Sequence, residues 1–332
     1  MQNKIAEYAK YFKEIADALP AIAEESGYSR GYIRRAFLRC FVIHHVHLGV
    51  FRSLRLYNYT GAMLRRYLTL HQCAAISDRL NAKADAEDID RLNDKHIFNG
   101  FFRGFVNRDW LYVPDSGPEQ IRAFLDAHER FLVKTCSDTR GQGIELHSRE
   151  DTDPEAFIRG VSGKPYLLEA LIVQHPDMAS INPSSVNTVR VITARKDDRV
   201  RIIGAGLRTG GGSQFVDNFH HGGTAYPIDL ETGIITGRGI DLYGNPVLRH
   251  PATGRVMPGF QIPHWDMLTE RVRSAAVLPP NVGYIGWDIA ITPEGVEFIE
   301  GNVNYPGTTI IQLDGPGPYA RLKEFMDEIG PL

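Results

Sequence analysis

Cysteine is scarce in this chain, and the few that occur form neither a disulfide framework nor a zinc motif. The 332 residues include three cysteines, Cys40, Cys73 and Cys136, and none belongs to a CxxC pair. Three thiols cannot all pair with one another inside one chain. Cysteine use of this kind is typical of a reducing compartment, so we expect a cytoplasmic protein.

The chain also lacks an excess of charge of either sign and any long hydrophobic run. Its 37 Lys and Arg against 40 Asp and Glu leave a formal net charge of -3, which indicates neither a nucleic-acid partner nor disorder. The most hydrophobic stretch, residues 36–51, contains Arg39 and three histidines and is too short to cross a bilayer. Residues 1–14 lack the apolar core of a signal peptide. We therefore expect a soluble protein without membrane insertion, large enough for two or three subdomains.

Residues 2–94 have the sequence pattern of helices. Apolar residues recur at helical spacing, as at Ile33, Phe37 and Phe41, and β-branched runs are few. Several arginines form a basic strip, which is either a solvated helix face or the lining of a site for an acidic substrate. Adjacent histidines on a helix point in different directions, so we interpret three histidines here as packing or surface residues: His44, His45 and His47.

After residue 94 the pattern changes to short strands and helices. An apolar run ends in Lys134, and the loop of residues 135–143 leads to a second apolar pair, which predicts a hairpin whose loop closes over phosphates. Gly141 and Gly143 in this loop are weak evidence by themselves, because tight turns use glycine whatever their function. Residues 165–174 predict a buried strand interrupted by Glu169, whose charge needs a partner.

Two further apolar runs, residues 186–193 and 201–208, predict strands paired across a turn at residues 196–198. They carry Arg190 and Arg208, which are candidates for a phosphate or carboxylate clamp. A solvent-facing arginine on an edge strand is the alternative for each. The glycine-dense loop of residues 209–223 mixes aromatic, amide and imidazole groups, which is typical of functional loops, and residues 316–332 predict a closing helix.

Oxygen-bearing side chains follow one another on a predicted hairpin near the C-terminus. Asp288 lies in one apolar run, and Glu300 and Asn302 end the next, sharing a face because strand side chains repeat every second residue. Hard oxygen ligands without His or Cys favour Mg²⁺ shared with substrate phosphates. A solvated hairpin is the alternative, but the near-continuous apolar runs indicate a buried sheet. The set therefore predicts a protein that handles a nucleotide phosphate.

These groups follow one order along the chain: Asp94 and Lys95, Lys134 with its glycine loop, Glu169, Arg190 and Arg208, Asn218 and His220 before two glycines, then Asp288, Glu300 and Asn302. This order resembles the ATP-grasp superfamily, in particular its sugar-transfer-associated branch. The pattern Phe215-x-x-Asn218-x-His220-x-Gly222-Gly223 is also similar to that of ribosomal-protein glutamate ligases. The resemblance covers residues 94–307.

The resemblance implies an α+β fold in which two α/β lobes clasp ATP. It divides the chain into a helical N-terminal region at 1–94, a small lobe with a phosphate lid at 95–170, and a large lobe with the metal site at 171–332. It implies that Lys95 and Lys134 reach the ATP phosphates beneath the lid with Gly141 and Gly143. It assigns the adenine-reading hinge to four residues: Glu169, Ala170, Leu171 and Ile172.

The resemblance also implies the chemistry. Asp288, Glu300 and Asn302 match the ligands of one or two Mg²⁺ ions, while Arg208 matches the cation that meets the transferring phosphate. Asn218 and the glycines after His220 match part of the reaction centre. Gly286 departs from relatives that place an arginine two residues before the metal aspartate, so Arg190 or Arg208 has to supply that charge.

The activity implied is an ATP-dependent ligase that joins a small-molecule carboxylate to an amine through an acyl phosphate, in polysaccharide or secondary-metabolite biosynthesis. No protein nucleophile is required, because ATP activates the carboxylate. His220 is a candidate for removing the amine proton, with His221 an equally placed neighbour. A phosphotransferase acting on a small molecule and a non-catalytic nucleotide-binding protein are the alternatives.

Overall fold

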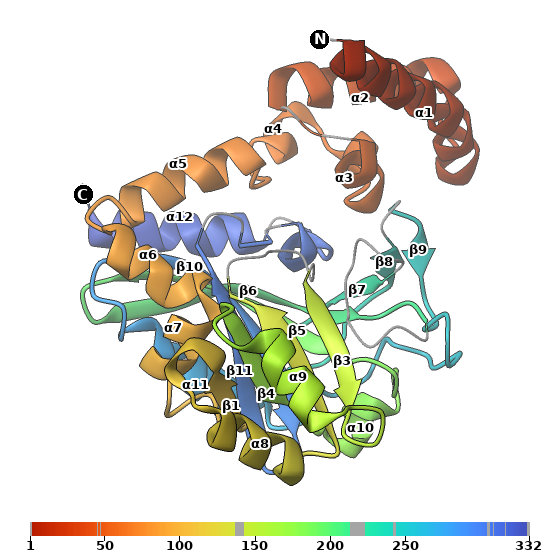
Figure 1. Ribbon diagram of the computed structural model, residues 1–332. Coiled ribbons are helices and arrows are strands. Elements are labelled where there is room, and N and C mark those ends of the chain that lie inside the picture. The colour runs from red at the N-terminus through yellow and green to blue at the C-terminus, as the bar shows by residue number, and fades with distance from the viewer. Residues whose placement is uncertain are drawn as a thin grey trace.

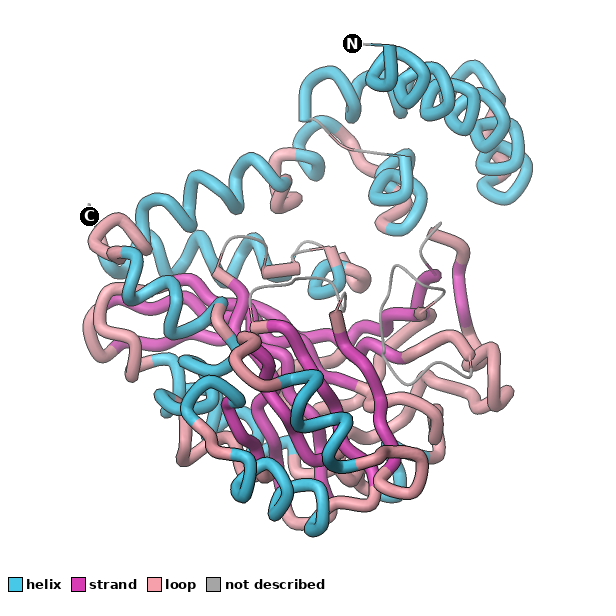
Figure 2. Tube along the Cα trace, viewed as in Figure 1, coloured by secondary structure: helices cyan, strands magenta, loops and turns pink. Residues whose placement is uncertain are grey.

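Two antiparallel β-sheets and a separate group of N-terminal helices make up the molecule (Figure 1). The computed structural model describes residues 2–44, 46, 48–136, 143–212, 223–241, 244–303, 306–307, 309–315 and 317–330. Figure 2 shows that strands begin only after the first long helical part of the chain. The architecture is α+β, as the sequence predicts.

The N-terminal region is helical, which confirms the prediction from its apolar spacing. Its core is formed by side chains such as Ile33, Phe37 and Phe51, each nearly fully buried. Thr69 and Asp85 form capping boxes that start two of the later helices. The helices are α1 (Gln2–Ser26), α2 (Arg30–His44), α3 (Leu48–Ser53), η1 (Leu56–Asn58), α4 (Gly61–Leu64), α5 (Leu70–Leu80), α6 (Ala86–Asn93) and α7 (Lys95–Phe101).

The first sheet has four strands in the order β1-β4-β2-β3, all antiparallel. The strands are β1 (Trp110–Tyr112), β2 (Arg130–Thr135), β3 (Ile144–Ser148) and β4 (Tyr166–Ala170), with η2 (Val113–Asp115) after β1. Helices α8 (Pro118–Ala127) and α9 (Pro154–Val161) cover one face, where Phe131, Val133 and Leu168 are buried. Because strand side chains alternate, Lys134 and Glu169 point to the opposite face. The hairpin around the glycine loop is confirmed, and so is the buried strand with Glu169, although it ends at Ala170 and not at residue 174 as predicted.

The second sheet has seven antiparallel strands in the order β11-β10-β5-β6-β7-β8-β9. They are β5 (Thr188–Lys196), β6 (Arg199–Thr209), β7 (Thr224–Pro227), β8 (Gly239–Asp241), β9 (Pro246–Val247), β10 (Tyr284–Thr292) and β11 (Gly295–Asn302). The β5–β6 and β10–β11 pairs are those that the apolar runs predict. Short α10 (Pro176–Ala179) precedes β5, and α11 (Trp265–Ala276) packs on one face against Val189 and Leu207.

Part of the opposite face of this sheet is covered by α5, α12 (Gly317–Ile329) and η4 (Ile310–Gln312). Tyr284 and Ile192 pack there against Leu322 and Phe325, so the predicted closing helix is confirmed. The close approach of η4 requires glycine on β6, because a Cβ at Gly206 would lie 2.2 Å from Cγ2 of Ile310. The rest of this face carries charged side chains.

The N-terminal helices are tied to the second sheet by buried polar contacts. The Gln312 side chain accepts a hydrogen bond from the Leu68 amide at 2.8 Å and donates one to the Leu68 carbonyl at 3.1 Å. Oδ1 of Asn81 accepts from the amides of Gly283 and Tyr284 at 2.8 and 2.9 Å. Both links join helices early in the chain to segments more than 200 residues later, so the N-terminal region is anchored beside the ends of β10 and β11.

The structure agrees with the cysteine and hydropathy patterns. Each cysteine is a buried free thiol, and burial raises the pKa of Cys40 and of Cys136 to about 11. Among the helices that the structure describes, none combines the length and apolar composition needed to cross a bilayer.

We expect Gln312→Ala to lower the free energy of unfolding by about 3 kcal/mol, because it leaves the buried amide and carbonyl of Leu68 without partners. Urea unfolding measures the loss, and limited proteolysis near residue 68 should become faster. The control is Gln261→Ala, at an exposed glutamine that contacts backbone carbonyls. An equal, small change in both variants would contradict this role for Gln312.

Candidate functional site

A row of charged residues crosses the uncovered part of the seven-stranded sheet. Asp288 on β10 is opposite Glu300 on β11 and, on its other side, opposite Arg190 on β5. Arg190 is in turn opposite Gly206 on β6. Arg208 lies two residues after Gly206 and therefore on the same face of the sheet. We call this surface, carrying Glu300, Asp288, Arg190 and Arg208, the charged face.

Asp288 is held by both arginines of the charged face. Arg190 donates to it in a bidentate manner, from Nε to Oδ1 at 2.5 Å and from Nη2 to Oδ2 at 2.7 Å. Arg208 donates from Nη1 to Oδ2 at 3.0 Å. Burial alone would raise the pKa of Asp288, but the two guanidinium groups hold it below its usual range. A metal ion at Asp288 would therefore have to share its carboxylate with the arginines.

Glu300 and Asn302 lie beside this pair. Nδ2 of Asn302 donates to Oε1 of Glu300 at 3.3 Å and to the Gly286 carbonyl at 3.4 Å. Burial and the neighbouring negative charge of Asp288 raise the pKa of Glu300, so its charged form needs an additional cation. Two carboxylates and an amide in contact fit a hard divalent cation. In the part of the chain that the structure describes, no group of three or more His, Cys, Asp or Glu could hold a metal by itself.

The absence of a side chain at Gly286 has a steric reason. A Cβ there would lie 2.6 Å from the carbonyl oxygen of Pro306 and 2.7 Å from its Cα. Pro306 in turn accepts a hydrogen bond from Nη1 of Arg190 at 2.9 Å. No arginine can therefore occupy position 286, and the cations beside Asp288 come from β5 and β6.

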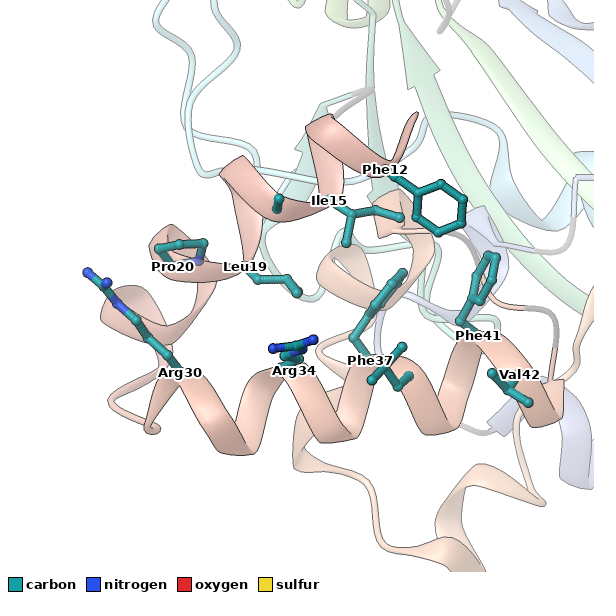
Figure 3. A pocket seen from close by; sticks show the side chains of 11 residues that line it. Phe12, Ile15, Leu19, Pro20, Arg30, Arg34, Phe37, Phe41 and Val42 are labelled. Carbon is teal, nitrogen blue, oxygen red and sulfur yellow. The ribbon is translucent and has the colours of Figure 1, made fainter. Parts of the chain in front are cut away.

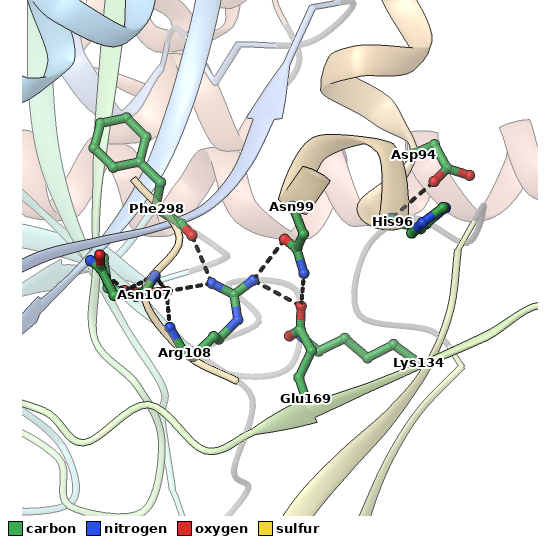
Figure 4. A network of polar contacts seen from close by, with 9 residues as sticks. Asp94, His96, Asn99, Asn107, Arg108, Lys134, Glu169 and Phe298 are labelled. Carbon is green, nitrogen blue, oxygen red and sulfur yellow. Dashed lines mark hydrogen bonds and ion pairs between the residues drawn. The ribbon is translucent and has the colours of Figure 1, made fainter. Parts of the chain in front are cut away.

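A second polar network joins the two sheets around Arg108, a residue that no motif in the sequence distinguishes (Figure 4). Arg108 donates from Nη2 to Glu169 at 2.8 Å and from Nη1 to Glu297 at 2.7 Å. Asn99 donates to the same Glu169 oxygen at 2.7 Å, and Lys134 pairs with the other. Glu169 and Lys134 belong to the four-stranded sheet and Glu297 to the seven-stranded sheet, so Arg108 bridges them.

A β-bulge places Glu297 on the charged face. The register shifts between Asp288 and Ile289, whose partners on β11 are Glu300 and Phe298, so Ile299 is left unpaired. Glu297 is consequently opposite Ala290, which shares a face with Asp288. Glu297 and Glu300 thus lie on one face although three residues separate them.

The Arg108 network contains two cations and two carboxylates, all buried. Burial opposes the charge of Glu169, yet Arg108 and Lys134 hold its pKa below the usual range. Burial lowers the pKa of Lys134 in spite of Glu169, and the positive charge of Lys95 contributes in the same direction. The structure therefore brings Lys134 and Glu169 together, and Lys95 lies beside the end of β2, where its amide donates to the Cys136 carbonyl at 3.4 Å. Since Glu169 uses both carboxylate oxygens within the protein, the adenine-reading role expected of its side chain stays a prediction.

The remaining expected residues fall beside this network or outside the described residues. Ala170 ends β4, and Leu171 and Ile172 follow it half-buried. Gly143 has φ 68° and its carbonyl accepts from the Thr135 amide at 3.1 Å, which closes the base of the lid loop. The residues outside the described part of the chain are Gly141, Asn218, His220, His221 and Gly222, together with His45 and His47.

The residues at which the second glycine loop begins and ends lie within the described part of the chain. The hydroxyls of Thr209 and Thr224 are 2.7 Å apart across β6 and β7, and both side chains are buried. His250 donates from Nε2 to the Gly210 carbonyl at 2.9 Å, and burial lowers its pKa, which favours the neutral ring. Asn182 also donates to this carbonyl, at 3.1 Å. The loop that carries Asn218 and His220 thus starts from a fixed position.

Two carboxylates in the sequence are signals for the Arg108 network, because Glu297 and Glu169 each interrupt an apolar strand. A buried carboxylate requires a cationic partner. Arg108 itself lies in the loop before β1, where neither periodicity nor spacing distinguishes it from other arginines.

The family model described as sugar-transfer associated ATP-grasp matches residues 155–327, more than half of the chain. No curated protein matches the sequence.

Among solved structures, the ATP-grasp ligase PsnB is similar over 72% of this chain and 62% of its own, with 17% identity and a TM-score of 0.42. An L-amino acid ligase from Bacillus licheniformis is similar over 71% and 48%, with 10% identity and a TM-score of 0.43. A carboxyaminoimidazole ribonucleotide synthetase from Thermus thermophilus is similar over 68% and 50%, with 16% identity and a TM-score of 0.42. The chain thus spans less than two thirds of the length of each of these three proteins.

We expect Arg108→Met to lower the free energy of unfolding by about 3 to 5 kcal/mol, because Glu169 and Glu297 lose a cation in a buried site. Urea unfolding followed by circular dichroism measures this. Adding Glu297→Gln should restore part of the stability, since it removes one of the orphaned charges. Arg149→Met, which breaks an exposed ion pair with Asp126, is the control and should cost less than about 1 kcal/mol. Similar losses in Arg108→Met and Arg149→Met would contradict the network's role.

Proposed function

Because the chain belongs to the sugar-transfer associated ATP-grasp family, we propose that it is an ATP-dependent ligase that joins a carboxylate to an amine. The observation that carries the proposal is the charged face, where Arg190 and Arg208 converge on Asp288 beside Glu300. Such an arrangement suits phosphoryl transfer, which depends on positioning and charge neutralisation and needs no protein nucleophile. We place the reaction in polysaccharide or secondary-metabolite biosynthesis.

The proposed nucleotide site lies between the charged face and the four-stranded sheet. Lys95 and Lys134 bind the phosphates, and the backbone of residues 169–172 contacts the adenine. Leu132, Ile144 and Leu146 support the base, because they are half-buried and share the face of Lys134 by register. These assignments are supported by the ion pair between Lys134 and Glu169 and by the effect of Lys95 on the pKa of Lys134.

Mg²⁺ would be held by Glu300 and Asn302 with a shared oxygen of Asp288. Bound there with ATP, the ion would neutralise phosphate charge during transfer. The raised pKa of Glu300 supports this assignment, because a divalent cation can take the place of its proton. Asp288 would have a double role, since it also orients the two arginines.

Arg208 is the better candidate for the cation that meets the transferring phosphate. Its side chain is 16% exposed, while the Arg190 side chain is 8% exposed and is fixed by Asp288 and the Pro306 carbonyl. In the proposed sequence a substrate carboxylate oxygen bonds to the γ-phosphorus and the bond to ADP breaks. The amine nitrogen then bonds to the acyl carbon, phosphate leaves, and the amine loses a proton, for which His220 is the proposed acceptor.

The test is incubation of the protein with MgATP and a panel of small carboxylates and amines, followed by measurement of ADP, phosphate and product mass. Ligation yields ADP, phosphate and a product equal to both substrates less water. Glu300→Gln is the control, expected to bind ADP but to release none from ATP. A phosphorylated small molecule would show a phosphotransferase, and ATP binding without turnover would show a binding protein; either result would reject ligation.

Arg208→Met and Arg190→Met should separate the two arginines. We expect Arg208→Met to lower kcat about 100-fold with unchanged folding, as for loss of one donor to transition-state charge. Arg190→Met should instead lower the free energy of unfolding by about 3 kcal/mol, because it removes the bidentate partner of a buried carboxylate. Arg199→Met, at an exposed position on β6, is the control for both measurements. Loss of stability in Arg208→Met with normal turnover would reverse the assignment.

A further inference from the structure

An apolar groove runs between α1 and α2, on the group of helices that stands apart from the sheets (Figures 1 and 3). Its volume is about 570 Å³. Phe12 and Val42 lie at one end, and Pro20 and Arg30 at the other. None of the residues assigned above to nucleotide, metal or catalysis lines it, so it is separate from the proposed ligase site.

Each wall of the groove is a row of side chains that lie four residues apart on one helix. On α1 the wall is formed by Phe12, Ala16 and Pro20, each four residues from the next. On α2 the wall has the same four-residue step: Arg30, Arg34, Leu38 and Val42. The floor is made by side chains of the buried core or packed against it, namely Ile15, Leu19, Phe37 and Phe41. Rows of this spacing are the ridges that pack into the grooves of another helix.

The apolar part of these walls is open to solvent. Phe12, Leu38 and Val42 are 56%, 47% and 66% exposed. Helix α2 already buries Ile33, Ala36 and Cys40 on its other side, so its apolar surface exceeds what the core of the region covers. A contiguous exposed apolar surface of this kind marks an interaction site.

The charged part of the groove is of one sign. Arg30 and Arg34, one helix turn apart, are its charged lining residues, and both are exposed. In the described part of the chain no ion pair involves either one. Helix α2 contributes four arginines and no acidic residue. The groove therefore complements a ligand that is apolar along most of its length and acidic at one end.

We propose that this groove binds an amphipathic α-helix of a partner protein, with acidic residues of that helix against Arg30 and Arg34 and its apolar face between Phe12 and Val42. The distance from position 30 to position 42 along α2 is about 18 Å, so the bound segment has at least about 12 residues. The apolar anchors follow helical spacing, as in other helix-in-groove complexes.

The probe is a synthetic helical peptide of about 14 residues with leucines at helical spacing on one face and two glutamates at one end of that face. Fluorescence polarisation measures its binding to the full-length protein. Leu38→Asp should abolish binding, and Arg30→Glu with Arg34→Glu should weaken it at least about tenfold. The same double variant should bind a peptide with lysines in place of the glutamates better than the unmodified protein does.

The matched controls are Leu278→Asp, at an exposed apolar position just after α11, and Arg199→Glu, at an exposed basic position on β6. Both should bind the peptide normally, and circular dichroism should show that all variants are folded. Equal binding of the glutamate and lysine peptides would overturn the proposal. The proposal would also be overturned if the peptide does not bind and the protein instead binds phosphatidylglycerol vesicles in a way that Leu38→Asp abolishes. A dimer in light scattering that Leu38→Asp dissociates would also overturn it, in favour of a second copy of this chain.

Discussion

The ion pair between Asp288 and Arg190 determines the arrangement of the charged face. Both groups are buried in the middle of a seven-stranded sheet, where either charge alone would cost several kcal/mol. Their bidentate geometry fixes the guanidinium plane, whose remaining nitrogen binds the Pro306 carbonyl. Gly286 and Gly307 are required on either side, because a Cβ at either would clash with Pro306 or with Arg190. One pair thus contacts Pro306 and requires glycine at positions 286 and 307, beside the candidate metal residues.

The same requirement for neutrality connects the two sheets. Glu169 from one sheet and Glu297 from the other are each too deeply buried to be charged alone, and Arg108 is shared between them. The positive charge of Lys134 neutralises the rest of this negative charge, on the side that would face a nucleotide. Because burial lowers the pKa of Lys134, added phosphate charge nearby would favour its protonated form. The proposed nucleotide binding would therefore depend on the same set of charges that joins the two sheets.

The sequence predicts β2 to β6, β10 and β11, because each of them is an apolar run with a turn beside it, but it does not single out the short strands β1, β7, β8 and β9. It predicts that Glu300 and Asn302 share a face, since this follows from strand periodicity alone. It does not predict the bulge at Ile299, which depends on pairing between β10 and β11 and moves Glu297 onto the charged face. Nor does it predict that Asp288 is bound by Arg190, because these residues are 98 positions apart and meet only through the β5–β10 register. Arg108 is missed for the same reason, since Glu297 is 189 positions away.

The groove and the charged face belong to different cores, and a short segment connects them. The helices around the groove have their own buried cluster, against which Leu313 packs. Gln312, the neighbouring residue, holds the backbone of Leu68. The described residues 306, 307 and 309–313 come after β11, which ends in Asn302, and include the carbonyl that Arg190 binds. A helix bound in the groove touches no residue of the charged face, so any effect on it has to pass through links such as this segment or the contact of Asn81 with the start of β10.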